Sequence, residues 1–307
     1  MELTNASSNK SSTFKGKLYT LIFFTTIFVI AILLTPGLAK LIPQLLLGAM
    51  FAHSLELAHE LGHHVHFRNE RLNRRVGVLL ALPMLVSYSS YKASHGHHHK
   101  ALGTADDKES FAYDYDQITT IKGFIYHLSM VNHYWSALRN MRAAVFGEVR
   151  ENVPSQIAWR IRNEFRLMAG LIIIMLTLSV TLQTSFFLNV WLLPLLLGTA
   201  PIHALIELPE HLGCDSSTTN VFKNTRTIRT NKFVEWLVNG NNWHVEHHEN
   251  PAVPMEYLRE RHKQLAPKIE HLEPSYREFY SKLFIDLISR SFRVKVGKPH
   301  FKNKNYA

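Results

Sequence analysis

The sequence contains a single cysteine, Cys214, in 307 residues. An intrachain disulfide and a Cys-x-x-Cys motif are therefore both excluded. Internal repeats of fixed period and low-complexity tracts are also missing, so neither a repeat architecture nor a long biased linker is predicted. Acidic residues are in the minority, and the formal net charge is +10. Because the basic residues flank apolar blocks, we expect an anionic membrane surface as the partner and no nucleic acid.

Hydrophobic residues make up 46% of the chain, which is ordinary for a soluble protein, but they are gathered in long blocks. Four blocks predict four membrane helices in two hairpins, at about residues 18–34, 38–58, 167–182 and 186–208. At about 1.5 Å per residue, the first block nearly crosses a hydrocarbon core of about 30 Å. A cleaved signal peptide is the alternative, but a Thr35-Pro36-Gly37 turn follows in place of a cleavage site.

Charge sets the expected orientation. Lys40 is the only basic residue between the first two blocks, and the connection at 183–185 has none. The positive-inside rule therefore predicts that both termini and all histidine clusters are cytosolic. We expect three regions: a polar tail at 1–17, a membrane domain at 18–265, and a basic cytosolic tail at 266–307 that includes Lys295, Lys298, Lys302 and Lys304.

The remaining segments are predicted to lie at or below the membrane surface. Residues 76–86 are apolar but too short to span, which indicates a buried or half-inserted segment. Apolar residues recur with helical spacing from Ile118 to Phe146, with His127 and His133 expected on the polar face rather than at a metal. A further amphipathic helix is predicted at 255–265.

Three histidine clusters carry the strongest chemical signal. Each places imidazoles at i and i+4, or at i, i+3 and i+4, so that a helix would bring them to one face. The clusters contain His59, His63 and His64, then His95, His98 and His99, then His244, His247 and His248. Neutral imidazole is the commonest metal ligand in proteins. Eight paired imidazoles, without counting His64, are too many for one ion and suit two ions.

The fourth apolar block ends in a further polar stripe, formed by His203, Glu207 and His211 at intervals of four residues. Polar groups in a membrane helix are costly and usually functional. We expect His211 to be a ninth ligand, Glu207 to bind metal directly or through water, and His203 to be either a ligand or a hydrogen-bonded structural residue. Carboxylates near the clusters could orient imidazoles or could be surface charges; they are Glu60, Asp106, Asp107, Glu246 and Glu249.

Two other classes of protein compete with a two-metal enzyme. His59-Glu60-Leu61-Gly62-His63 is also the HExxH pattern of zinc metalloproteases, which would indicate an intramembrane protease. That reading lacks a further ligand and leaves the other two clusters without a role. A membrane protein that binds metal without catalysis explains the histidines but not their pairing with membrane hairpins.

The three clusters resemble the boxes HxxxH, HxxHH and HxxHH of the membrane fatty acid desaturase superfamily. The runs ELPEHLGC, NTRT and NNWHVEHHENPAVP add to the resemblance, which covers about residues 20–265. It implies a mushroom-like all-α fold, with four membrane helices under a cytosolic cap that carries the boxes. It also implies a di-iron centre that uses O2 and two electrons from a separate donor. The eight box histidines would be iron ligands, and His211 matches the extra histidine before the third box.

Some features narrow the resemblance. The third box begins with His244, whereas front-end desaturases have Gln there, and no cytochrome b5 motif is present. The donor would therefore be a separate ferredoxin, rubredoxin or cytochrome b5. The same boxes occur in hydroxylases, acetylenases, ketolases and alkene-forming decarboxylases, and we predict desaturation because it is the commonest chemistry.

The fatty acyl substrate could be linked to membrane lipid, coenzyme A or acyl carrier protein. Four residues beside the boxes are predicted to line its tunnel, with interfacial anchoring as the alternative: Trp243, Asn242, Tyr88 and Tyr91.

Overall fold

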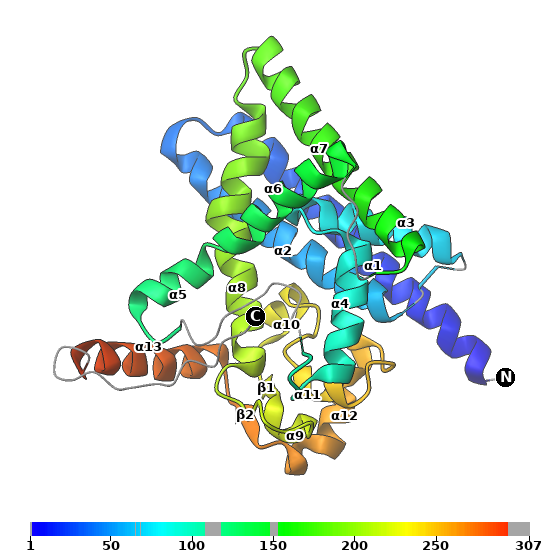
Figure 1. Cartoon of the computed structure of the whole chain (residues 1–307), viewed down its shortest axis with the longest axis vertical. Helices are drawn as coiled ribbons and strands as arrows, with labels where there is room; N and C mark the ends of the chain where they lie inside the picture. The colour runs from blue at the N-terminus through cyan, green and yellow to red at the C-terminus, as the bar shows by residue number, and fades with distance from the viewer. Residues whose placement is uncertain (1, 65, 68, 108–117, 148–152, 294–307) are drawn as a thin grey trace.

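The computed structural model is an all-α bundle with a helical cap, and it describes residues 2–64, 66–67, 69–107, 118–147 and 153–293. Four helices are long and apolar enough to cross a membrane: Thr13–Leu34, Gly37–His63, Ser155–Thr181 and Leu188–His211. The predicted fold class, an all-α membrane protein with four membrane helices, is confirmed, and the chain is a multi-pass membrane protein. Figure 1 shows these helices in the upper part of the molecule and the cap below them.

The first hairpin consists of α1 (Glu2–Leu34) and α2 (Leu41–His63), joined by the short 3-10 helix η1 (Gly37–Lys40). The helix α1 begins at Glu2 and so includes most of the segment predicted as a polar tail, and the boundary at residue 17 stays a prediction. Within that segment, Phe14 is fully buried and stacks on His66 at 4.5 Å between ring centroids. Phe14 therefore packs on the segment that follows the first histidine cluster.

The second hairpin consists of α7 (Ser155–Thr181) and a fourth span that ends in α8 (Ala200–His211). The upper part of this span is wound as two π-helical segments, η4 (Leu188–Leu192) and η5 (Pro194–Thr199). Such segments are rare and commonly occur at functional sites. Within η5 the span crosses α2 closely, and the Thr199 hydroxyl donates a hydrogen bond to the Gly48 carbonyl at 3.0 Å.

Between the hairpins the chain enters the bundle and turns back. The helix α3 (Glu70–Ala81) and the short η2 (Leu82–Met84) are followed by α4 (Tyr88–Ala101), and the two halves meet at 95°. Leu85 forms the corner with φ of 59°, a left-handed conformation. This agrees with the predicted half-inserted segment before the second cluster. The bend aims α4, with its histidines, down into the cap.

The expected single helix from 118 to 146 is broken into α5 (Ile121–Leu128) and α6 (Val131–Phe146). Met130, at φ of 48°, ends one helix and starts the next, because a left-handed residue interrupts the helical hydrogen-bond ladder. The two histidines here do not lie on a polar face. His127 is buried and contacts the Ala204 carbonyl, while the His133 Nε2 donates to the Met84 carbonyl at 2.8 Å.

The cap is built mainly from the C-terminal third of the chain. Its elements are α9 (Val221–Asn224), β1 (Arg226–Ile228), α10 (Lys232–Leu237), α11 (His244–Glu249), α12 (Met255–Leu265), η6 (Ala266–Lys268), β2 (His271–Glu273) and α13 (Tyr276–Arg293). The predicted helix at 255–265 is confirmed as α12. The two short strands pair in parallel and tie α9–α11 to the segment after α12.

The region predicted as a C-terminal tail contributes to the fold. Leu287 on α13 is fully buried against Phe124 on α5 and Leu208 on α8. The proposed basic residues Lys295, Lys298, Lys302 and Lys304 lie outside the described residues. The boundary at 265 thus remains a prediction.

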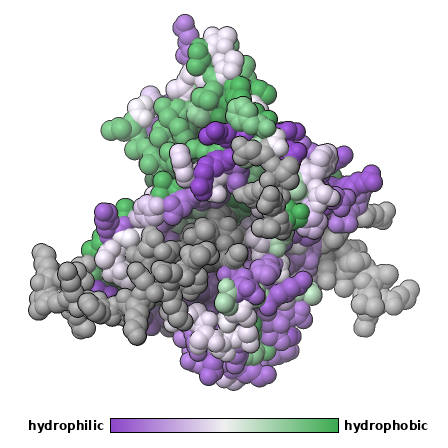
Figure 2. Space-filling view, viewed as in Figure 1, coloured by the Kyte–Doolittle hydropathy of each residue, from purple (hydrophilic) through white to green (hydrophobic). Residues whose placement is uncertain are grey.

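Hydropathy separates the two halves of the molecule. Figure 2 shows apolar residues gathered over the upper part of the molecule, where α7 and the upper part of the fourth span lie, and hydrophilic residues over the lower cap. Along α7, large apolar side chains such as Ile173 and Val180 are exposed in the isolated chain. A lipid environment would cover this apolar surface.

Candidate metal centre

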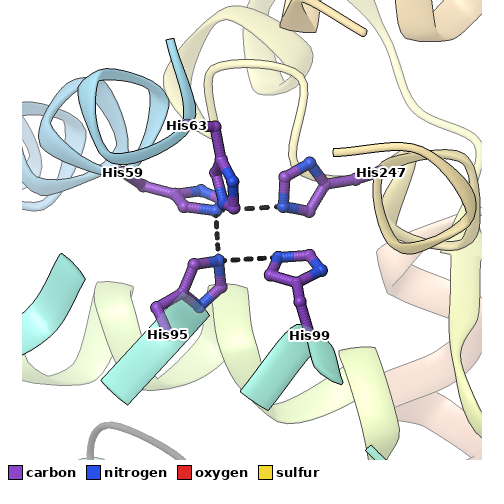
Figure 3. A group of neighbouring side chains, drawn as sticks. All are labelled: His59, His63, His95, His99 and His247. Carbon is purple, nitrogen blue, oxygen red and sulfur yellow. Dashed lines mark hydrogen bonds between the residues drawn. The ribbon is translucent and has the colours of Figure 1, made fainter. Parts of the chain in front are cut away.

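Five imidazoles from three separate helices converge where the membrane helices meet the cap (Figure 3). Their potential ligand nitrogens all lie within 4.8 Å of one another, and the residues are His59, His63, His95, His99 and His247. The Nε2 atom of His59 is 2.7 Å from the Nε2 of His95 and 3.1 Å from that of His247. We refer to these residues as the five-histidine group.

A second group lies beside the first. The nitrogens of His98, His211 and His248 also lie within 4.8 Å of one another. His244 completes the group, because its Nε2 is 3.1 Å from the His248 Nε2 and 3.3 Å from the His211 Nε2. These residues are the four-histidine group. The structure thus brings all eight box histidines together with His211.

Helical spacing explains how two neighbouring groups arise from one motif. Successive residues of an α-helix point about 100° apart, whereas residues at i and i+4 share a face. On α4, His95 and His99 therefore point into the five-histidine group, and the intervening His98 points into the other. On α11, His247 serves the five-histidine group and His244, with the following His248, serves the four-histidine group. Each HxxHH box contributes to both.

Hydrogen bonds to the outer ring nitrogen fix the direction of three imidazoles in the four-histidine group. The Nδ1 of His98 lies 2.9 Å from the Asp107 carboxylate, and the Nδ1 of His211 lies 3.0 Å from the Asn224 carbonyl. The Nδ1 of His244 is 3.0 Å from the Oδ1 of Asn241. Because each Nδ1 then carries the proton, the Nε2 lone pair faces the group and is free to bind a cation.

Burial keeps the three imidazoles of α11 neutral. The pKa values of His244, His247 and His248 are held well below the usual value, chiefly by burial and then by the neighbouring imidazoles. Metal ligands must be deprotonated, and a neutral imidazole meets this requirement at neutral pH. Nine converging imidazole nitrogens fit the binding of two adjacent metal ions. The residues present therefore suit a dimetal centre.

The carboxylates predicted to support the clusters are placed differently from one another. Asp107, rather than Asp106, orients a ligand; Asp106 is exposed and its backbone carbonyl accepts from His97. Glu246 is fully buried but accepts hydrogen bonds from Thr227 and His262. Glu249 forms an ion pair with Arg261.

Glu60 is also occupied by partners other than the metal groups. Its carboxylate lies 3.0 Å from the Lys17 ammonium and 3.0 Å from His66, and it accepts from Asn239 at 2.8 Å. A general base must be free to take a proton from a water at the metal, whereas this carboxylate is engaged by three other partners. The metalloprotease reading of the HExxH pattern therefore does not fit.

The deeper polar stripe forms a separate buried bridge. The His203 ring lies between two carboxylates, at 3.1 Å from Glu207 and 3.5 Å from Glu56. Of the described residues, neither His203, Glu207 nor His64 belongs to a group of converging metal donors. The structural role proposed for His203 agrees with these contacts, and they link α2 to α8 on the membrane side of the metal groups. Glu56 was not predicted, because only the fold brings it to His203.

The four residues predicted to line an acyl tunnel have different surroundings. Trp243 packs on His262 and donates to Glu235, and Asn242 pairs with Ile228 in the cap. Tyr88 donates to the Leu61 carbonyl at 2.7 Å.

Tyr91 alone both touches the centre and borders a cavity. Its ring stacks on His95 at 5.3 Å, and it lines a cavity of about 150 Å³. The other lining residues include Ser87, Ser90 and Ser136. The contacts of Trp243, Asn242 and Tyr88 account for their burial, and the tunnel role of all four residues stays a prediction.

Comparison with known proteins agrees with this geometry. The model of the family described as "Fatty acid desaturase" matches residues 36–280. The chain is 26% identical over 240 residues to an sn-1 oleoyl-lipid 12-desaturase of Picosynechococcus sp., covering 72% of this chain and 67% of that protein. It is also 36% identical over 67 residues to an sn-1 acyl-lipid omega-3 desaturase (ferredoxin) of Nostoc sp., covering 22% and 19% of the two chains.

Proposed function

Because this chain belongs to the fatty acid desaturase family, and is therefore an oxidoreductase acting on fatty acids, we propose that it inserts a double bond into the acyl chain of a membrane lipid at a di-iron centre. The observation that carries the proposal is the convergence of nine imidazoles, in groups of five and four, where the membrane helices enter the cap. An all-nitrogen dimetal site beside a bilayer suits oxidation of a lipid-borne chain.

The proposed reaction converts –CH2–CH2– to –CH=CH– and consumes one O2, two electrons and two protons, with two waters as the other product. When bound, the iron pair supplies the oxidising power that an unactivated C–H bond requires. The five-histidine group would hold one iron and the four-histidine group the other. Iron suits imidazole ligands, and O2 chemistry requires a metal that changes oxidation state.

The residues of the chain hold this centre in place. Asp107, Asn224 and Asn241 keep three of the four imidazoles of the four-histidine group in the tautomer that presents Nε2. The buried bridge from Glu56 through His203 to Glu207 joins the helix that carries His59 to the helix that carries His211. Displacing a reacting group by about 1 Å can cost about 100-fold in rate, so rigid support of the ligands is part of the mechanism.

The linkage of the acyl group, the electron donor and the orientation in the membrane are inferred from three features. Both relatives are named as desaturases of acyl lipids, and one name specifies ferredoxin. The net charge of +10 would attract an acidic donor protein of the ferredoxin type. The positive-inside rule favours a cytosolic location for the centre and both termini, since Lys40 is the only basic residue in the outer connections.

The test uses the full-length protein, reconstituted with iron in liposomes that contain monounsaturated glycerolipids. Reduced ferredoxin and O2 are added, and lipids are analysed by mass spectrometry, with acyl-coenzyme A and acyl carrier protein substrates in parallel. Lipid acyl chains lighter by two hydrogens would support the proposal. A product heavier by one oxygen would make the enzyme a hydroxylase. Turnover of the thioesters alone would refute the lipid linkage.

A further inference from the structure

Glu210 lies beside His211 at the cap end of α8 and is 91% buried, with 9% of its surface exposed. Its carboxylate and the nitrogens of His211 and His244 lie within 4.8 Å of one another. The Glu210 Oε2 is 3.2 Å from the His244 Nε2. No other carboxylate among the described residues belongs to a converging donor set with the box histidines.

The nitrogen that Glu210 meets is decisive. A carboxylate that merely orients a metal-bound imidazole contacts the nitrogen that points away from the metal. Asp107 does this, at the Nδ1 of His98. Glu210 instead meets the Nε2 of His244, which is the nitrogen turned toward His211 and His248. Its oxygen therefore lies on the metal side of the ring.

Asn241 explains how both groups are held in this arrangement. Its Oδ1 lies 3.0 Å from the outward Nδ1 of His244, and its Nδ2 donates to the Glu210 Oε1 at 2.7 Å. One amide thus fixes the imidazole and one carboxylate oxygen together. The other carboxylate oxygen, Oε2, points to the four-histidine group.

Charge supports the same conclusion. Imidazole ligands contribute no negative charge, while two divalent ions would bring four positive charges into a buried site, which is costly without nearby anions. Glu60 is already compensated by Lys17, and Glu246 is bonded to His262. Glu210 lies directly at the converging nitrogens, where a carboxylate offsets the most charge.

We propose that Glu210 is a ligand of the metal in the four-histidine group, which gives that ion four nitrogens and one carboxylate oxygen. This inference rests on the proposed function, since it presumes two bound metals. It makes the two ions chemically different: one would have five neutral imidazoles, and the other would have an anionic donor. The sequence carries the residue in Leu208-Pro209-Glu210-His211, but only the fold brings it to His244.

The test is a metal titration of the purified full-length protein, using Co2+ because its visible absorption reports the donor set. Glu210→Gln keeps the shape of the side chain and removes the anionic oxygen, and Glu210→Asp keeps a carboxylate. Asp107→Asn makes the same change of charge at an outward nitrogen, and Glu249→Gln makes it at an ion pair with Arg261. Each variant is compared with the wild type for cobalt per chain and for spectrum at saturation.

We expect Glu210→Gln to weaken the binding of one of the two Co2+ ions by about 100-fold or more and to change the absorption spectrum of that ion, because a ligand is lost. Glu210→Asp should recover part of the affinity. Asp107→Asn should leave the spectrum at saturation unchanged, and Glu249→Gln should match the wild type. A Glu210→Gln protein that binds two equivalents with wild-type affinity and spectrum would overturn the assignment.

A measurement on the wild type covers the case in which Glu210→Gln does not fold. Difference infrared spectra of protein labelled with 13C-glutamate should show a carboxylate shift on filling the four-histidine group. No such shift would refute the proposal. These results are separable from the proposed function: wild-type protein that binds two irons and desaturates lipid upholds that function, whatever the ligand test shows.

Discussion

The helix α2 packs so closely against the fourth span at Gly48 that a single added methyl group should disturb the metal centre. A Cβ added at Gly48 would lie 2.6 Å from the Gly198 Cα, 2.6 Å from the Pro194 carbonyl oxygen and 2.8 Å from the Thr199 nitrogen. All three are backbone atoms, so no side chain can rotate away. Normal carbon–carbon contacts are about 3.5–4.0 Å, so Gly48→Ala must separate the two helices by about 1 Å.

This separation bears on the metal groups because the two helices carry ligands for both. The helix α2 provides His59 and His63, and α8 provides His211. Overpacking of this kind costs about 1–3 kcal/mol, offset in part by the better helix propensity of alanine, about 1 kcal/mol. Misplacement of about 1 Å at the centre costs about 100-fold in rate. We therefore expect a modest loss of stability and a large loss of turnover per bound iron.

The assay measures thermal unfolding in detergent, iron per chain and desaturation rate per iron for Gly48→Ala. Gly170→Ala is the matched control, because Gly170 lies within the membrane helix α7 and an added Cβ would meet nothing within 4 Å. The control should unfold and turn over like the wild type. If Gly48→Ala also kept the wild-type unfolding temperature and turnover, the close crossing would not position the ligands.

Four other predictions follow from contacts in the structure. Asp107→Asn should weaken binding of one metal about 10- to 100-fold in a metal titration, and an unchanged affinity would contradict its orienting role. Lys17→Met should lower the free energy of unfolding by about 3 kcal/mol, because it leaves the buried Glu60 carboxylate without its cation; recovery in Lys17→Met/Glu60→Gln is the check. His133→Gln should keep full iron content and lose about 1 kcal/mol of stability, as it loses one hydrogen bond, and loss of iron would place His133 in the centre. The α11 imidazoles have pKa values well below the usual value, so iron should stay bound at about pH 6. The metal-free protein should lose stability as the pH falls below about 6.5, because the unfolded chain then binds protons that the folded chain does not. Iron release centred near pH 6.5 would contradict this prediction.

Local sequence patterns sufficed to predict the membrane helices and the histidine clusters. Hydropathy gave the four spans because each is a continuous apolar helix, and the i, i+3, i+4 spacing predicted which imidazoles share a face. The same spacing did not show that each HxxHH box serves two groups. That division depends on how α4 and α11 face each other.

Several features that sequence reasoning missed depend on tertiary packing. Lys17 reaches Glu60 across 43 residues, and Asn241 reaches Glu210 across 31. The left-handed Met130 breaks a helix whose apolar periodicity continues through the break. Asp106 and Asp107 have the same chemistry and adjacent positions, so only the fold distinguishes the one that contacts His98. In each case the local pattern is compatible with more than one arrangement, and tertiary packing selects one.

The most direct test of the proposed di-iron centre is a structure of the iron-loaded protein with anomalous scattering recorded at the iron absorption edge. We expect two iron peaks per chain. One should lie among His59, His63, His95, His99 and His247, and the other among His98, His211, His244 and His248. A single peak, or a peak outside these groups, would contradict the assignment of a di-iron centre to the nine histidines.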